Sequence, residues 1–165
     1  MNARYILGLD PGLQRTGWGL IRQQDNRLSF LGCGTLRAST KGELSERLHH
    51  LNRLLAEVLS RHTIDSVAME ETFMTANGMS TLKLGQARGA LLLTCAQAGF
   101  TVHEYAATLI KKTVTGAGRA EKTQVAAMVG YLLPGALTHE PDAADALAVA
   151  ITHAHHASLA RLLPA

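Results

Sequence analysis

Residues 5–12, Tyr5-Ile6-Leu7-Gly8-Leu9-Asp10-Pro11-Gly12, form the stretch that decides the fold. A short run of aliphatic residues that is closed at once by proline and glycine predicts a buried strand ending in a tight turn. A buried strand has little use for a carboxylate, because burying a charge without a partner is costly. We therefore expect Asp10 to lie where the strand emerges from the core.

A second strand with the same kind of ending is predicted at 64–70, Ile64-Asp65-Ser66-Val67-Ala68-Met69-Glu70. If the two strands are parallel neighbours in one sheet, Asp10 and Glu70 are presented at the same edge. Two carboxylates held there by rigid backbone repel each other unless a cation or a proton lies between them. Strands alternate their faces, so only one of Glu70 and Glu71 can point to this site; we favour Glu70 and expect Glu71 to face solvent.

Length and composition indicate one domain spanning residues 1–165. The net charge of +3 mildly favours a polyanionic partner such as nucleic acid and leaves its identity open. Cys33 and Cys95 are expected to be buried thiols of a reducing compartment. The amino terminus lacks a signal-peptide pattern, and no apolar stretch reaches the roughly 18 residues that cross a bilayer. We expect a cytoplasmic protein that does not bind membranes.

The pattern along the chain predicts an α/β domain with a mixed sheet. The expected elements are strands ending at Asp10 and covering 18–22 and 28–36, a helix at 42–60, strands at 64–70 and 100–105, and helices at 80–98, 106–112, 120–133 and from 140 onward. The helix at 42–60 returns the chain to the strand at 64–70, which predicts a β-α-β crossover and hence parallel pairing. Residues 113–119 are expected to form a glycine-containing loop.

Two further acids open the last helix. Asp142 and Asp145 are three residues apart, so both carboxylates lie on one face of its first turn. Together with Asp10 and Glu70 they form a set of oxygen ligands of the kind that Mg²⁺ prefers, and two such ions can assist phosphodiester cleavage. Taken singly, each acid has a plainer interpretation: Asp142 as a helix cap, Asp145 as a partner of the helix dipole, and Asp10 as a turn former.

The basic and aromatic residues can likewise be interpreted either as nucleic-acid contacts or as ordinary structural residues. A cluster around the 113–119 loop can hold phosphates or form a solvated basic face; it comprises Lys111, Lys112, Arg119 and Lys122. Phe73 can stack on an unpaired base, or it can fold back as a lid on the core. His153, His155 and His156 crowd the last helix, but no acid or cysteine stands at a zinc-site spacing from them, so we expect no zinc.

These residues together resemble the RuvC family of Holliday-junction resolvases, structure-selective endonucleases of the ribonuclease H-like superfamily. The resemblance runs in family order from about Ile6 to His153. It rests on Gly8-Leu9-Asp10-Pro11-Gly12 with Thr16-Gly17, Met69-Glu70 with Phe73-Met74 and Asn77, Leu82-Lys83-Leu84-Gly85-Gln86-Ala87-Arg88-Gly89, Glu104-Tyr105-Ala106-Ala107, Ala120-Glu121-Lys122, and Asp142-Ala143-Ala144-Asp145-Ala146-Leu147-Ala148. The tail after His153 carries no part of it.

The resemblance implies a ribonuclease H-like fold with a five-stranded mixed sheet flanked by helices. It implies a homodimer that resolves four-way junctions by paired symmetric nicks in recombination and repair, leaving 5′-phosphate and 3′-hydroxyl ends, and that works with a RuvA–RuvB branch-migration machine. Asp10, Glu70, Asp142 and Asp145 are the expected catalytic ligands of two Mg²⁺ ions, which Mn²⁺ is expected to replace, and Lys122 joins them. The expected DNA contacts are Phe73, Lys83, Arg88, Lys111, Lys112, Arg119 and Lys122. The helix at 80–98 is the expected dimer interface.

Three other classes of protein share parts of this pattern. An Asp-x-Gly turn after a first strand also occurs in actin-like ATPases and sugar kinases, but those folds need two such domains and this chain supplies one. A junction-binding protein without catalysis would use the acids as caps and turns. A ribonuclease H acting on RNA–DNA hybrids would share the plan of acids.

Overall fold

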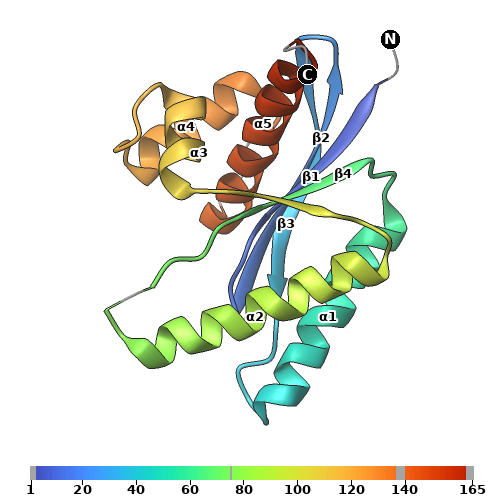
Figure 1. The fold of residues 1–165 in the computed structure, drawn as a ribbon, viewed down its shortest axis with the longest axis vertical. Helices are drawn as coiled ribbons and strands as arrows, with labels where there is room; N and C mark the ends of the chain where they lie inside the picture. Colours follow the sequence, from blue (N-terminus) through green and yellow to red (C-terminus); the bar gives the residue numbers. More distant parts are fainter. Residues whose placement is uncertain (1–2, 75, 137–139, 163–165) are drawn as a thin grey trace.

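The protein, described here from a computed structural model, is built on one five-stranded sheet; the structure describes residues 3–74, 76–136 and 140–162. The strand order is β3-β2-β1-β4-β5. The strands are β1 (Arg4–Asp10), β2 (Arg15–Gln24), β3 (Arg27–Arg37), β4 (Ser66–Glu70) and β5 (Val102–Tyr105), and the helices are α1 (Leu44–Arg61), α2 (Gly78–Gln97), α3 (Ala107–Thr115), α4 (Lys122–Leu132) and α5 (Pro141–Leu162). Figure 1 shows α1 and α2 on one side of the sheet and α3, α4 and α5 on the other.

The pairing around β1 is the one that the sequence predicts. β1 is antiparallel to β2 and parallel to β4. In the parallel pair Leu9 lies opposite Met69, so Asp10 and Glu70 follow at the same level of the sheet. β5 extends the parallel part, with Tyr105 opposite Glu70. The two acids are therefore presented side by side at the carboxyl edge of the central strands.

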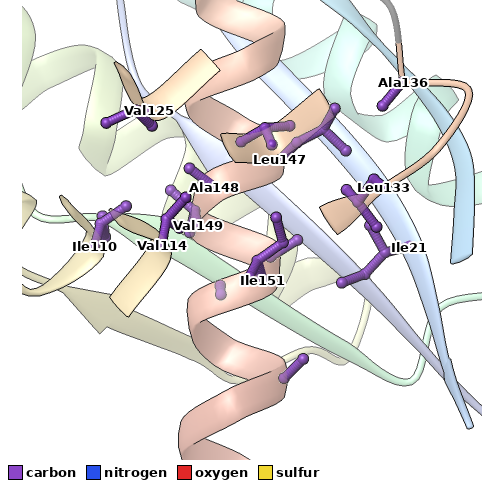
Figure 2. Packing of buried hydrophobic residues seen from close by; sticks show 14 of the residues in the cluster. Ile21, Ile110, Val114, Val125, Leu133, Ala136, Leu147, Ala148, Val149 and Ile151 are labelled. Atoms are coloured by element: carbon purple, nitrogen blue, oxygen red, sulfur yellow. The ribbon is translucent and has the colours of Figure 1, made fainter. Parts of the chain in front are cut away.

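The side chains of each strand alternate between the two faces of the sheet, so they contribute to two separate cores. The same alternation decides which way the acids point. Leu7 and Leu9 belong to the core under α1 and α2, whereas Ile6 and Ala68 belong to the core under α5. Because side chains two residues apart share a face, Asp10 and Glu70 lie on the α5 side. Figure 2 shows the α5 core, in which α5 packs against residues of β2, α3 and α4 and of the segment after α4; its labels mark Ile21, Ile110, Val114, Val125, Leu133, Ala136, Leu147, Ala148, Val149 and Ile151.

Helix α5 lies unusually close to β1 and β2 because glycines face it. A Cβ placed at Gly8 would stand 2.1 Å from the carbonyl oxygen of Ala146, and one at Gly17 would stand 1.9 Å from that of Asp142. Both distances are too short for any side chain. The helix contributes small residues to the same contact, since Ala143 is fully buried. This backbone-to-backbone approach brings the start of α5 onto the edge where β1 ends.

The expected glycine-containing loop is shorter than predicted, because α3 continues to Thr115. Val114 is 3% exposed, and its burial in the α5 core extends the helix through residues that the sequence pattern assigned to a loop. The helix ends at Gly116, whose φ of +83° is a left-handed conformation and whose N–H donates to the carbonyl of Lys112 at 2.8 Å. The other predicted elements are confirmed within a few residues, except that β2 and β3 are longer.

The histidines of α5 take part in packing against β5. His153 is 2% exposed and its Nδ1 lies 2.9 Å from the hydroxyl of Tyr105, while its ring lies 4.6 Å from that of His103. Burial, then the neighbouring charges of His103 and Arg4, lower the pKa of His153 to about 4. At neutral pH this side chain is therefore an uncharged part of the core. None of the helices in the described ranges has the length and apolarity to cross a membrane.

The close contact of α5 gives a direct test of the fold. We expect Gly8→Ala to lower the free energy of unfolding by about 2 kcal/mol or more, because the added methyl group forces the backbone of α5 away from β1. Gly32→Ala is the matched control, since a Cβ at that strand glycine meets the Trp18 ring at an ordinary 3.5 Å. Urea unfolding measures both. Equal effects of the two substitutions would contradict the close-packing account.

Candidate active site

A hollow of about 180 Å³ opens at the carboxyl edge of β1 and β4, beneath α3, α4 and α5. Acids and lysines line the hollow together with four apolar residues, Ala107, Ile110, Val125 and Ala148, which we call its apolar floor. The lining residues are Asp10, Glu70, Ala107, Ile110, Lys111, Lys122, Val125, Asp145 and Ala148. Five separate elements of the chain, β1, β4, α3, α4 and α5, thus meet at the point where the sequence predicts a site.

Three of the four predicted acids line this hollow. Asp10 ends β1, Glu70 ends β4, and Asp145 lies on α5 one turn after Asp142. Asp142 is in the first turn of α5 and does not line the hollow, yet its charge acts on Asp10. Glu71, which was expected to face solvent, does not line the hollow and is half-buried. The interpretation of Asp142 as the helix cap is wrong, because α5 already begins at Pro141.

The acids oppose one another's ionisation. Burial, followed by the charges of Glu70 and Asp145, raises the pKa of Asp10 to about 8. Burial and the charge of Asp145 also raise the pKa of Glu70. The fold therefore holds these carboxylates together at a cost in stability. A cation or proton placed among them relieves that cost.

Two lysines supply part of the missing positive charge. Lys122 donates from Nζ to Oδ2 of Asp145 at 2.9 Å, and this hydrogen bond raises the pKa of the lysine. Lys122 is placed by the start of α4, where Glu121 and Gln124 form reciprocal capping hydrogen bonds. Lys111 lies on α3 and lowers the pKa of Glu70 through its charge. The two ammonium groups thus share the hollow with the acids.

The donor set suits a hard divalent cation. It consists of carboxylate oxygens alone, and Mg²⁺ is usually held by one or two carboxylates, with waters and substrate phosphates as its other ligands. Among the described residues, no three His, Cys, Asp or Glu side chains are grouped so that they could share a metal ion. That spacing fits an ion whose remaining ligands come from water and substrate. It does not fit a closed structural metal site.

The other predicted nucleic-acid contacts lie outside the hollow. Phe73 is 59% exposed on the segment that follows β4, so the alternative that it folds back as a lid on the core is wrong. Lys112, Arg119 and Lys83 are exposed. Arg88 is half-buried and donates from Nε to Oε1 of Glu104 at 2.9 Å, so its side chain is engaged within the protein.

The apolar floor of the hollow was missed by the sequence analysis. Each apolar lining residue is three residues away from another lining residue of the same helix. Val125 follows Lys122 on α4 at this spacing, and Ala148 follows Asp145 on α5. Ala107 and Ile110 repeat this spacing on α3. The helical period could have identified these residues, because one face of a helix that presents a functional side chain also presents its neighbours one turn away.

The raised pKa of Asp10 predicts how stability depends on pH. In the unfolded chain this carboxyl ionises near pH 3.8, and in the fold near pH 8. The folded state therefore holds the proton more tightly, and the stability of the metal-free protein falls as pH rises between these values. We expect Asp10→Asn to raise Tm by at least about 3 °C at about pH 9 and by less at about pH 5.

Thermal unfolding at the two pH values measures this effect. Asp25→Asn is the control, because Asp25 is exposed and its positive φ of 53° is one that asparagine tolerates. Adding Mg²⁺ is expected to raise the Tm of the wild type at about pH 9 and to leave Asp10→Asn nearly unchanged. A destabilised Asp10→Asn protein at high pH would show that the acids do not repel one another.

Comparison with known proteins identifies the family. The family model of crossover junction endodeoxyribonuclease RuvC matches residues 6–153. The proteins of that name from Azorhizobium caulinodans and Xanthobacter autotrophicus are 59% identical over 157 residues and 57% identical over 156 residues, covering 95% and 94% of this chain and 93% and 92% of their own lengths. A structure of T. thermophilus RuvC in complex with Holliday junction substrate superposes with a TM-score of 0.87 at 31% identity, covering 95% of this chain and 96% of that one. The ribonuclease H-like fold is thereby confirmed, and this chain belongs to the RuvC family.

Proposed function

We propose that this protein is an endonuclease that resolves four-way DNA junctions. The observation that carries the proposal is the hollow in which Asp10, Glu70 and Asp145 meet Lys111 and Lys122. It is supported by membership of a family named for crossover junction cleavage and by a relative whose structure contains a Holliday junction. An exposed site at a sheet edge can receive a phosphodiester, whereas a closed pocket could not.

Asp10, Glu70, Asp142 and Asp145 would hold the divalent ions, two Mg²⁺ by our proposal, with Mn²⁺ as a substitute. Bound there, the ions would activate a water and stabilise the departing 3′ oxygen, leaving 5′-phosphate and 3′-hydroxyl ends. Asp142, which lies one turn before Asp145, contributes its charge to the set. Because the pKa values of Asp10 and Glu70 are raised, binding of the ions would displace protons from these carboxyl groups and would strengthen as pH rises.

Lys122 and Lys111 act in this proposal as fixed positive charges. The hydrogen bond from Lys122 to Asp145 raises the pKa of the lysine, so the side chain stays protonated and stabilises negative charge on the phosphate. Lys111 faces Glu70 from α3. In this proposal the exposed side chain of Phe73 stacks on an unpaired base, and the exposed Lys112 and Arg119 contact phosphates.

A homodimer would account for paired nicks, because a two-fold interface places identical sites symmetrically on a near-symmetric junction. The exposed stripe of α2, formed by Met79, Leu82 and Leu93, is the proposed interface; these side chains are 61%, 55% and 57% exposed. Gly85 and Gly89 on the same helix have open space beside them, so a second helix can approach closely. Cytoplasmic location and action with a RuvA–RuvB machine are proposed from family membership alone.

Cleavage of a synthetic four-way junction tests the proposed reaction. In Mg²⁺ we expect the wild type to make paired symmetric nicks, whereas Asp10→Asn and Glu70→Gln should bind the junction and cut at least about 100-fold more slowly, since each removes a charged ion ligand. Asp25→Asn, a linear duplex and an RNA–DNA hybrid are the controls. Tight binding by the wild type without cleavage in Mg²⁺ or Mn²⁺ would leave a DNA-binding protein and overturn the assignment.

The proposed interface makes its own prediction. Leu82→Glu combined with Leu93→Glu is expected to shift the protein from dimer to monomer, because two charges would have to be buried in an apolar contact. Leu31→Glu is the matched control, since Leu31 is also an exposed leucine, at 46%, but lies on β3. Sedimentation equilibrium measures the mass of each variant. Unchanged dimerisation of the double variant would place the interface elsewhere.

A further inference from the structure

A second hollow lies near the same edge of the sheet as the candidate active site. It has a volume of about 220 Å³ and is formed by the turn after β1 together with α1 and the first turns of α2. Its lining residues are Leu13, Gln14, Arg47, Ser80, Lys83 and Leu84. Leu13 is 8% exposed and packs in the core under α1 and α2, so this hollow opens on the side of the sheet away from α5.

The lining carries two positive charges and no acid. Arg47 comes from α1 and Lys83 from α2, and both line the hollow. Glu43 and Glu46, one turn or less before Arg47, are occupied in the reciprocal cap at the start of α1. Arg47 and Lys83 therefore present positive charge to the same hollow. This arrangement favours an anion between them.

The two cations differ in how they are held. Arg47 donates from Nε to the carbonyl oxygen of Ser39 at 2.8 Å, which orients its guanidinium while its terminal amino groups make no hydrogen bond to any described residue. Lys83 likewise has no acidic partner among the described residues. The N–H of Ala38 donates to the carbonyl of Gln14 at 3.1 Å, which ties the turn after β1 to the chain that follows β3. An oriented guanidinium together with an exposed ammonium is well suited to the oxygens of a phosphodiester.

The turn after β1 connects a residue of the first hollow to a residue of the second over a short stretch of chain. Asp10 lines the first and Leu13 the second, and three residues of chain separate their Cα atoms by at most about 11 Å. Along one DNA strand charges recur every ~3.4 Å of helix axis, so this distance corresponds to a few nucleotides. A strand whose reacting phosphate lies at Asp10 can therefore continue along the connecting turn, with a later phosphate near the hollow that Arg47 and Lys83 line.

We propose that Arg47 and Lys83 form a second phosphodiester-binding site, which holds the DNA backbone a few nucleotides from the phosphate presented to Asp10. This inference rests on the proposed function, because it assigns a further contact to the same substrate. The sequence analysis expected Lys83 to contact DNA. It did not predict that Lys83 and Arg47, from two different helices, line the same hollow. Gln14 completes the site with a neutral amide from the connecting turn.

Junction binding without divalent ions tests the site. We expect the double variant Arg47→Gln, Lys83→Gln to bind a fluorescent four-way junction about tenfold more weakly than the wild type. The slope of log K against log salt should fall by about 1, the loss of one phosphate contact. The control variant Arg27→Gln, Arg53→Gln removes the same charge from exposed positions outside this hollow, and its slope should stay near that of the wild type. Thermal unfolding confirms that both variants are folded.

A neutral methylphosphonate, placed in turn at each position within five nucleotides of the cut, locates the contact. At one position it should weaken binding by the wild type and have no further effect on the double variant. Equal affinity and salt slope of the double and control variants would overturn the inference while the proposed function stands. A wild type that shows no junction binding at all would instead overturn the proposed function and this inference with it.

Discussion

The close approach of α5 to the first two strands is the constraint on which the site depends. Backbone meets backbone at Gly8 and Gly17, where any side chain would collide with the carbonyl oxygens of α5. This contact holds the start of the helix against the carboxyl edge of β1. Asp145 of α5 consequently lines a small hollow together with Asp10 and Glu70. Leu147 and Ala150, which meet the strand glycines, also belong to the core under α5. The packing that stabilises the fold is therefore also the packing that sets the geometry of the site.

The site is a balance of charges that the fold enforces. Strand pairing fixes Asp10 beside Glu70, and burial adds to their mutual repulsion, so neither ionises at its ordinary pH. Lys122 compensates Asp145 from the capped start of α4. A fold that gathers acids around one hollow despite this repulsion sacrifices stability for function, as active sites commonly do. Our proposal assigns the remaining compensation to divalent cations and the DNA phosphate.

Much of this could be predicted from sequence because the strongest signals are local. The aliphatic run ending in Asp10-Pro11-Gly12 predicted both the strand and the acid at its end, and the β-α-β crossover predicted the parallel partner. Spacing on α5 placed Asp142 and Asp145 on one face, but only the packing shows that Asp145 lines the hollow and Asp142 does not. The end of α3 was mispredicted because Val114 is buried by tertiary contacts that outweigh the weak helix propensity around it. The partner of Arg88 and the meeting of Arg47 with Lys83 were also beyond prediction, since each joins segments distant in sequence.

A crystal structure of the wild type soaked in Mn²⁺, measured at a wavelength where manganese scatters anomalously, tests the central claim most directly. The account predicts an anomalous peak in the hollow, bound by oxygens of Asp10 and of at least one other acid of the set, together with a change in the contact between Lys122 and Asp145. A hollow without a peak at saturating Mn²⁺, with Asp10 and Glu70 sharing a proton instead, would contradict it.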